Sequence, residues 1–218
     1  MAYQMQSLAD KVFDIMEKKI LAGDYPGGAV LTESKLSEEL EVSRTPIREA
    51  VGRLEHEHLV QVSSKGIQVI GVSTEDIADI YEIRYRLEGL AVRRVCEHVN
   101  DQFIREAQEA LDLQAFYTER GDSESIKNMD SQFHQILYRY CQSNPLRYTL
   151  EPLIMRIVKF RKASLSAPDR AQHSLDEHRA IFEAIICRDP DRAEQLMQEH
   201  IRAASTSSLL VAQSQNLE

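Results

Sequence analysis

The stretch EVSRTPIREAVGRLE, residues 41–55, is the part of the chain that most clearly predicts a fold. Apolar residues recur in it at the spacing of a single helix face, namely at Ile47, Ala50, Val51 and Leu54. Thr45 followed by Pro46 predicts where this helix begins, because threonine caps helix starts and proline suits the first helical position. We therefore expect a short amphipathic helix with one buried side and one side rich in arginine.

The segments around this helix extend the pattern. Ser7 is expected to cap a helix running to about Ala22, and Thr32 is expected to cap a second, brief helix. The side of the first helix predicted to be buried carries Leu8, Val12 and Ile15. After the arginine-rich helix, LVQVS and IQVIGV alternate in polarity around SKG, which predicts a β-hairpin. This order of elements is typical of a winged helix-turn-helix.

Three arginines cluster at this helix, namely Arg44, Arg48 and Arg53. In a helix-turn-helix the second helix enters the major groove of DNA, and its first residues contact bases and phosphates. Arg44, Arg48 and Thr45 are therefore candidate DNA contacts, since a guanidinium can bridge a guanine edge or grip a phosphate. Lys65 and Gly66, at the hairpin tip, are candidate contacts from the wing. The alternative is a solvated arginine side that pairs with nearby glutamates.

From Ser73 onward the character of the sequence changes, because amphipathic helices follow one another without strands between them. They are expected at about 74–98, 102–119, 123–142, 145–166, 169–187 and 190–211. We therefore predict a mainly α protein of two domains: a winged helix-turn-helix over residues 1–72 and an all-helical bundle over residues 73–218.

The composition narrows the class of protein. The formal net charge of −9 argues against a non-specific coat on nucleic acid, although a local cluster of cations is enough to bind DNA. No apolar run approaches the ~18 residues of a membrane span, and the first residues lack a secretory signal. Three widely spaced cysteines predict reduced thiols, so we expect a cytoplasmic protein.

The first 70 or so residues resemble a known family in a specific way. LTESKLSEELEVSRTPIREAVGRLEHEHLVQVSSKGIQVI is similar to the DNA-binding domain of GntR-family bacterial transcription regulators. The resemblance implies that Arg44, Arg48, Ser34 and the wing residues contact operator DNA. Ser34 stands where many members have arginine, which implies a weaker contact. Glu41 stands where glycine is common, which implies either a strained turn or repulsion near DNA.

The second half places ligand-type side chains inside its apolar stripes. Asp130 and His134 lie four residues apart within the apolar side of one predicted helix. His178 and His200 lie within the apolar sides of two others. A buried carboxylate without a partner is costly, and a metal ion bound by all four groups would remove that cost. Each residue also has a simpler interpretation, as a satisfied core residue, and Asp130 could merely pair with His134.

Three imidazoles and one carboxylate suit Zn²⁺, Ni²⁺, Mn²⁺ or Fe²⁺, and the ligand set does not choose among them. A metal with open positions could bind an effector carboxylate. It could also be the signal itself, in a metal-responsive regulator, or support a metal-dependent enzyme that acts on a small acid.

Arg84 is a second anomaly, because it lies in the apolar stripe of its predicted helix. An arginine inside a helical bundle needs an anion. One candidate is Glu88, one turn later on the same helix. The other is the carboxylate of a bound ligand, which a guanidinium can hold through two hydrogen bonds.

Residues 73–212 also resemble a known domain, the FadR-type ligand-binding domain called FCD. The matching motifs occur in the family's order: IYEIRYRLEGLA, DSQFHQILY, DEHRAIFEAI and MQEHI. The resemblance implies a metal held by Asp130, His134, His178 and His200, with a small organic acid beside it. It implies that Arg84 and Asn144 contact that acid. Taken together, these features predict a homodimeric, ligand-responsive transcription regulator that acts as a repressor and is not an enzyme.

Overall fold

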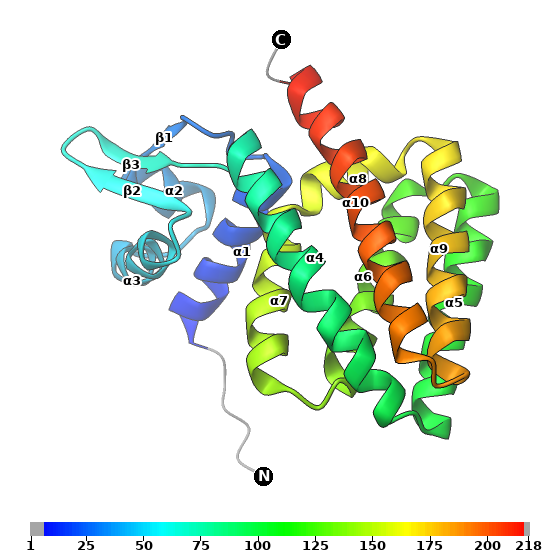
Figure 1. The fold of residues 1–218 in the computed structure, drawn as a ribbon. Coiled ribbons are helices and arrows are strands. Elements are labelled where there is room, and N and C mark those ends of the chain that lie inside the picture. Colours follow the sequence, from blue (N-terminus) through cyan, green and yellow to red (C-terminus); the bar gives the residue numbers. More distant parts are fainter. Residues whose placement is uncertain (1–6, 216–218) are drawn as a thin grey trace. The chain divides into compact units, whose positions relative to one another are not determined.

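In this computed structural model the chain divides between Val72 and Ser73 into two compact units. The structure describes residues 7–215, with only the backbone of Pro168 and Gln215. The first unit contains α1 (Leu8–Ala22), β1 (Val30–Leu31), α2 (Glu33–Glu39), α3 (Arg44–His56), β2 (Val60–Ser63) and β3 (Gly66–Val69) (Figure 1). The strands form an antiparallel sheet in the order β1-β3-β2. The predicted winged helix-turn-helix is confirmed.

Helix α1 begins as the sequence predicts but buries a different side. The Ser7 side chain accepts a hydrogen bond from the backbone of Asp10, whose carboxylate accepts one from the Ser7 backbone in return. The buried residues are Ala9, Val12, Phe13, Met16, Ile20 and Leu21. Leu8 and Ile15, predicted to be buried, are 52% and 43% exposed. The helix carries two adjacent apolar stripes, and the one with the aromatic ring packs against the rest of the unit.

Helix α3 begins at Arg44, two residues earlier than predicted. Ser43 occupies the capping position with extended backbone and makes no side-chain cap hydrogen bond. The prediction that Thr45 caps the helix is therefore wrong, and Pro46 is the third helical residue. Proline fits there because the first N–H groups of a helix have no acceptor within it. The preceding turn holds Glu41 at a φ of 54°, the left-handed region that favours glycine.

The second unit is an all-helical bundle, as predicted. Its helices are α4 (Thr74–Glu97), α5 (Asp101–Arg120), α6 (Ser123–Tyr140), α7 (Asn144–Arg156), α8 (Val158–Leu165), α9 (Pro168–Ile186) and α10 (Pro190–Gln215). The side chains of Asn100, Asp122 and Ser143 cap α5, α6 and α7. Each accepts a hydrogen bond from a backbone N–H in the first turn of its helix.

One helix predicted over residues 145–166 is in fact two. The break falls at Ile157, whose backbone leaves the helical conformation at φ −102° and ψ 11°, five residues after Pro152. Proline weakens a helix because it lacks an N–H donor. The break allows α8 to bury Arg161, Ser164 and Leu165. A continuous hydrophobic pattern on both sides of Ile157 conceals this change of direction from the sequence.

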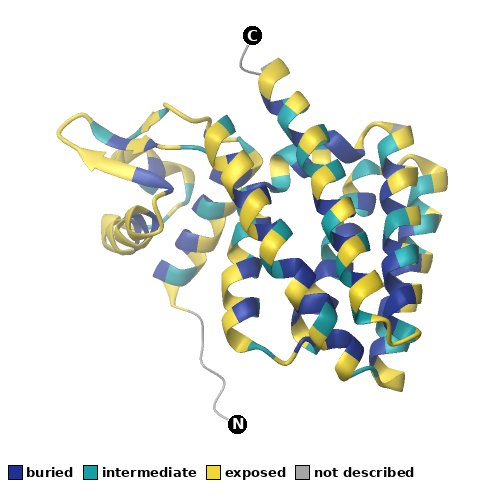
Figure 2. Cartoon of the chain, in the orientation of Figure 1, coloured by how far each residue is buried: buried dark blue, intermediate teal, exposed yellow. Residues whose placement is uncertain are grey.

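Helix α10 lies beside both α4 and α9 (Figure 1). Gly89 permits close packing here, because a Cβ at that position would come within 3.1 Å of Glu194 Cγ. Buried residues of this unit lie on the sides of helices that face one another, with exposed residues outside (Figure 2). Within residues 7–215, none of the helices has the length and hydropathy that crossing a bilayer requires. The three cysteines are free thiols.

Candidate functional site

Three histidines from three helices meet inside the second unit. His134 comes from α6, His178 from α9 and His200 from α10, and each is at most 2% exposed. The Nε2 atom of His200 lies 3.3 Å from that of His134 and 3.4 Å from that of His178. One ring nitrogen of each histidine lies within 4.8 Å of the others. Two nitrogens bound at ~2.0–2.1 Å to one tetrahedral ion would lie about 3.3 Å apart, so this spacing fits a shared ion.

The other nitrogen of each ring faces an acceptor. His134 Nδ1 donates to Glu88 Oε2 at 2.7 Å, and His178 Nδ1 donates to Gln114 Oε1 at 3.0 Å. His200 Nδ1 donates to Glu177 Oε2 at 2.7 Å. These acceptors keep the proton on Nδ1, so the three Nε2 atoms present lone pairs to one another. Converging lone pairs need a cation or a donor between them, as in the metal sites of proteins.

The electrostatics favour the protonation states that metal binding needs. Burial lowers the pKa of His134 and holds the pKa of His178 well below its ordinary value. Both rings are therefore neutral near pH 7. Burial also raises the pKa of the Glu88 carboxyl, but the nearby charges of Arg84 and His134 outweigh burial and hold that pKa well below its usual range. The acceptor for His134 therefore remains ionised.

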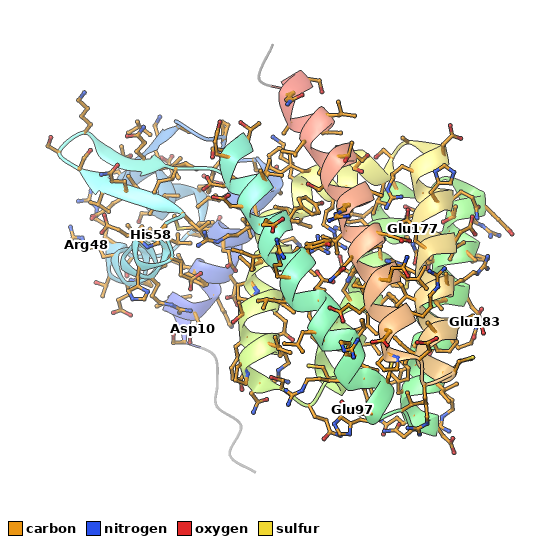
Figure 3. All side chains as sticks on the ribbon, in the orientation of Figure 1. Asp10, Arg48, His58, Glu97, Glu177 and Glu183 are labelled. Atoms are coloured by element: carbon orange, nitrogen blue, oxygen red, sulfur yellow. The ribbon has the colours of Figure 1, made fainter. Side chains whose placement is uncertain are left out.

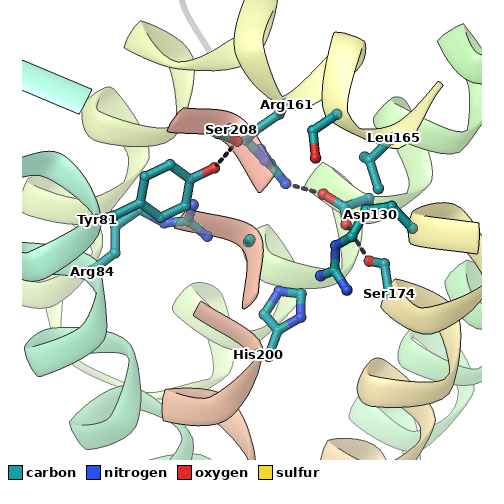
Figure 4. Close-up of a pocket in the computed structure, with 11 residues that line it drawn as sticks. Tyr81, Arg84, Asp130, Arg161, Leu165, Ser174, His200 and Ser208 are labelled. Atoms are coloured by element: carbon teal, nitrogen blue, oxygen red, sulfur yellow. Dashed lines mark hydrogen bonds and ion pairs between the residues drawn. The ribbon is translucent and has the colours of Figure 1, made fainter. Parts of the chain in front are cut away.

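Asp130, the fourth predicted ligand, lies beside this triad but is engaged elsewhere. Its Oδ1 is 3.7 Å from His178 Nε2 and accepts a hydrogen bond of 3.0 Å from Ser174 Oγ. Its Oδ2 accepts a hydrogen bond from Arg161 Nη2 (Figure 4). Burial raises the pKa of this carboxyl, but the charges of Arg161 and the histidines hold it well below its usual range. The structure thus brings three of the four predicted ligands to one point and pairs the fourth with an arginine.

Of the two anions predicted as partners of Arg84, the structure shows Glu88. Its Nε donates to Glu88 Oε1 at 2.6 Å, and both side chains are fully buried. Glu88 therefore bridges Arg84 and His134. Arg84 Nη1 is also buried, yet it has no hydrogen-bond partner among the described residues. One half of the guanidinium is thus satisfied, and the other half remains available to a further anion.

A cavity of about 20 Å³ lies next to Arg84 (Figure 4). It is large enough for about one water molecule. Its lining includes Tyr81, Arg84, Asp130, Arg161, Arg170, Ser174, His200 and Ser208. Tyr81 and Ser208 close one side through a hydrogen bond of 2.7 Å between their hydroxyls. The cavity therefore touches the triad at His200 and offers three guanidinium groups to a negatively charged guest.

Arg170 repeats the arrangement of Arg84. Both of its terminal nitrogens donate to the Glu177 carboxylate, at 2.8 and 2.7 Å, and Glu177 accepts from His200. Burial raises the pKa of Glu177, but hydrogen bonds from His200 and Arg170 lower it to about 2. Arg84 and Arg170 both line the cavity, and each is joined to one histidine of the triad through a glutamate. Glu177 is labelled in Figure 3.

Asn144 does not belong to this site. It is the exposed first residue of α7, and it is not among the residues that line the cavity. The cap of α7 is Ser143, which accepts a hydrogen bond from the Leu146 backbone. The structure therefore does not place Asn144 at this cavity.

In the first unit, the predicted DNA contacts share an exposed surface at the start of α3. Arg44, Thr45 and Arg48 are all exposed, while Ile47 and Leu54 are completely buried. Arg48 projects from α3 (Figure 3), and its Nε donates to both carboxylate oxygens of Glu33 at 2.9 Å. Its partner is thus on α2, and not among the glutamates of its own segment.

Ser34 and the hairpin complete this surface. Arg44 Nη2 donates to Ser34 Oγ at 3.2 Å, so the two predicted contacts lie together on α2 and α3. Lys65 is exposed at the tip between β2 and β3. Gly66 has a φ of 124°, and a Cβ there would lie 2.7 Å from the Leu31 carbonyl oxygen. The hairpin itself therefore requires glycine at this position, whether or not DNA contacts it.

The sequence did not reveal several residues that hold the triad in place, namely Gln114, Arg161, Arg170, Ser174 and Glu177. Glu88 was considered only as a partner of Arg84, and its bond to His134 was missed. A polar residue within an apolar stripe was the signal used for the histidines. Arg161 carried no such signal, because the break at Ile157 displaced the stripe of α8.

Two family profiles match the chain. The profile of the FCD domain matches residues 79–203, and that of the bacterial regulatory proteins of the gntR family matches residues 8–69. Together they include the three histidines of the triad, most of the residues that line the cavity, and the arginine-rich surface of α3.

Characterised relatives match along most of the chain. A gluconate operon transcriptional repressor of Bacillus licheniformis is 26% identical, over 81% of this chain and 74% of its own length. The HTH-type transcriptional repressor RspR of Escherichia coli strain K12 is 26% identical, over 93% and 89%. The solved structure of E. coli McbR/YncC superposes with a TM-score of 0.76 at 26% identity, covering 91% of this chain and 95% of that one.

Proposed function

This chain belongs to the gntR family of bacterial regulatory proteins and carries an FCD domain, and from that premise we propose that it is a transcriptional repressor released by a small organic acid. Relatives that span most of the chain are named as repressors, which supports this sign of regulation. Since its target is bacterial DNA, the protein acts in the cytoplasm.

The DNA-binding half of this proposal is supported by the exposed arginines at the start of α3. Arg44 and Arg48 stand at the end of the helix that a helix-turn-helix inserts into the major groove, and Thr45 lies between them. Ser34, Lys65 and Gly66 extend the contact to α2 and the wing. We propose that two copies of the chain bind as a homodimer, with half-sites separated by about one helical turn, ~34 Å.

The sensing half depends on one observation, the convergence of three Nε2 atoms whose Nδ1 partners are all acceptors. We propose that a divalent transition metal, one of Zn²⁺, Ni²⁺, Mn²⁺ or Fe²⁺, is held by His134, His178 and His200, with Asp130 as the fourth ligand. When bound, such an ion supplies a Lewis-acidic position that attracts a carboxylate.

The effector is a small carboxylate that contacts Arg84. The unpartnered Nη1 of this buried side chain supports that role, because an unsatisfied guanidinium N–H is costly until an anion reaches it. The acid regulates the protein only if it binds one arrangement of the dimer better than the other. Because Glu88 joins Arg84 to His134, the acid and the metal act on one connected group of side chains.

Metal binding tests the site directly. Replacing His178 with Ala is expected to abolish stoichiometric binding of Zn²⁺, measured by isothermal titration and by metal analysis after gel filtration. The matched control is His173→Ala, since His173 is an exposed histidine on the same helix. Stoichiometric, tight binding by His178→Ala would contradict the proposed metal centre.

A second experiment separates an acid-responsive repressor from a metal-responsive regulator. The protein is first used to select binding sites from random duplex DNA, and enrichment of an inverted repeat is expected. Binding to that repeat is then measured with Zn²⁺, with chelator, and with Zn²⁺ plus a panel of mono- and dicarboxylates. Release by one acid in the presence of Zn²⁺ supports the proposal. Release or capture by metal alone would favour the metal-responsive alternative.

A further inference from the structure

Arg161 occupies the carboxylate that the proposed metal centre needs. Its Nη2 donates to Asp130 Oδ2 and its Nη1 donates to Ser131 Oγ at 3.2 Å. Asp130 Oδ1 accepts from Ser174, 3.7 Å from His178 Nε2. Arg161 and Asp130 are each no more than 5% exposed, so water does not replace either partner easily. Asp130, the proposed fourth ligand, is therefore paired with the permanent positive charge of Arg161.

A metal ion and Arg161 compete for Asp130. A cation next to the triad would lie close to this guanidinium, and one carboxylate cannot neutralise both charges in a buried site. If the Asp130 carboxylate turned toward the ion, its hydrogen bond with Arg161 would weaken or break. The arginine left behind must then find another anion or bear the cost of an unpaired buried charge.

The charge balance around the triad shows what that anion must supply. Three arginines and three carboxylates surround the triad, namely Arg84, Arg161, Arg170, Glu88, Asp130 and Glu177. With the histidines neutral, as metal ligands are, these charges cancel. A divalent ion adds two positive charges that no described side chain offsets. An anionic guest therefore becomes more favourable once a metal has bound.

Building on the proposed metal centre, we propose that Arg161 is an exchangeable counter-charge that makes metal and acid bind cooperatively. Without metal it pairs with Asp130. With Asp130 as a ligand of the metal, the guanidinium of Arg161 would be free to bind the carboxylate of the acid in the cavity that both residues already line. The cavity is now water-sized, and movement of Arg161 off Asp130 makes room for a guest larger than water.

Thermodynamic linkage makes this testable, because the acid must tighten metal binding by the factor by which the metal tightens acid binding. The probes are Co²⁺, whose visible absorption reports ligand number, and acetate, the smallest suitable carboxylate. Full-length Arg161→Met is compared with the wild type and with Lys162→Met, which alters an exposed neighbour on α8.

Two results are expected. Without acetate, Arg161→Met binds Co²⁺ roughly tenfold more tightly than the wild type, because Asp130 is free to ligate. Acetate tightens Co²⁺ binding by the wild type and by Lys162→Met about fivefold or more, and tightens it clearly less in Arg161→Met, where only the metal and Arg84 remain to attract the acid. Equal Co²⁺ affinity in Arg161→Met and the wild type would overturn the exchange. An acetate effect that is absent from the wild type, or that is undiminished in Arg161→Met, would overturn the role of Arg161 as a receptor of the acid.

A second variant covers the case in which Arg161→Met does not fold because Asp130 is left unpaired. The double variant Asp130→Asn, Arg161→Met removes both charges and retains similar shapes. It is expected to gain less Co²⁺ affinity over Asp130→Asn than Arg161→Met gains over the wild type, because only loss of the arginine charge remains to favour the ion. Its acetate effect is expected to be smaller than that of the wild type. Equal gains in the two backgrounds would contradict competition for Asp130. Failure of the wild type to bind Co²⁺ would instead refute the proposed metal centre, which keeps the two failures distinct.

Discussion

Arg48 in the first unit and Arg84 in the second are both paired with a glutamate, yet the side chain of Arg48 is 64% exposed and that of Arg84 only 1%. An exposed ion pair contributes about 0–1 kcal/mol, because water and salt compete with it. A buried pair leaves a strongly destabilising charge when one partner is removed. An arginine–glutamate pair is therefore easily separated in the first unit, whereas in the second unit its separation would destabilise the fold.

The difference explains how each unit is able to meet its ligand. Glu33 holds Arg48 in place on the surface but gives it up at little cost, so a phosphate or a guanine can replace it. Glu88 holds Arg84 permanently and orients His134 at the same time. The surface arginine is poised to exchange partners, whereas Arg84 is part of the framework and offers only its unpartnered nitrogen.

The largest expected effect tests the buried side of this contrast. Arg84→Met leaves the Glu88 carboxylate buried with His134 as its remaining partner, and should destabilise the chain by about 3–5 kcal/mol. Arg48→Met, the exposed counterpart, should change stability by less than about 0.5 kcal/mol. Urea unfolding followed by circular dichroism measures both. Similar losses in the two variants would remove the distinction between the pairs.

The next effect tests the exposed side, on DNA selected as described above. Arg48→Ala should weaken binding by about 1–3 kcal/mol, and if the contact is to a phosphate it should lower the salt slope by about 1. Arg53→Ala is the control on the same helix, because Arg53 pairs with Asp10 on α1 at 2.6 Å. Fluorescence anisotropy at several salt concentrations measures both. An equal loss in the control would mean that the arginines act only through general charge.

The pH dependence of stability sharpens the contrast further in the metal-free protein. Between about pH 6.5 and 5.5 the unfolded chain protonates His178, whereas the folded chain, with its lowered pKa, does not. The unfolded state thus binds more protons, and stability falls as pH falls, by up to ~1.4 kcal/mol per pH unit for this group. His178→Gln should reduce that slope. His173→Gln, which changes an exposed histidine, should leave unchanged the part of the pH dependence that comes from the buried histidines. If the two variants had the same pH dependence of stability, the effect of burial would be contradicted.

The smallest effect concerns strain on the DNA-binding surface. A left-handed backbone costs a residue other than glycine ~1–2 kcal/mol, and Glu41→Gly removes that cost. The greater conformational freedom of glycine in the unfolded chain offsets about 0.5–1 kcal/mol of this gain in stability. Thermal unfolding should show a net gain of about 0.5–1 kcal/mol. Glu41→Gln removes the charge but keeps the strain, and should show no such gain. If both variants gained equally, charge and not conformation would limit this turn.

Much of the candidate site could be predicted because it follows helical periodicity. Asp130 and His134 stand out as polar residues on the buried side of one helix, and His178 and His200 do so on two others. The error at α1 has the same origin, since Leu8 and Ile15 also recur at helical spacing. Periodicity indicates that one side is buried, but two adjacent apolar stripes leave open which one packs against α3.

Local order along the chain was therefore enough to predict most of the helices, the hairpin and many of the side chains that point inward, because spacing and capping act over a few residues. It could not predict that His134 would meet Glu88 across 46 positions, that His178 would meet Gln114 across 64, or that Arg161 would hold Asp130. Those contacts arise when separate helices pack, and packing depends on the shapes of whole surfaces. The breaks and caps that orient each helix decide which atoms finally meet.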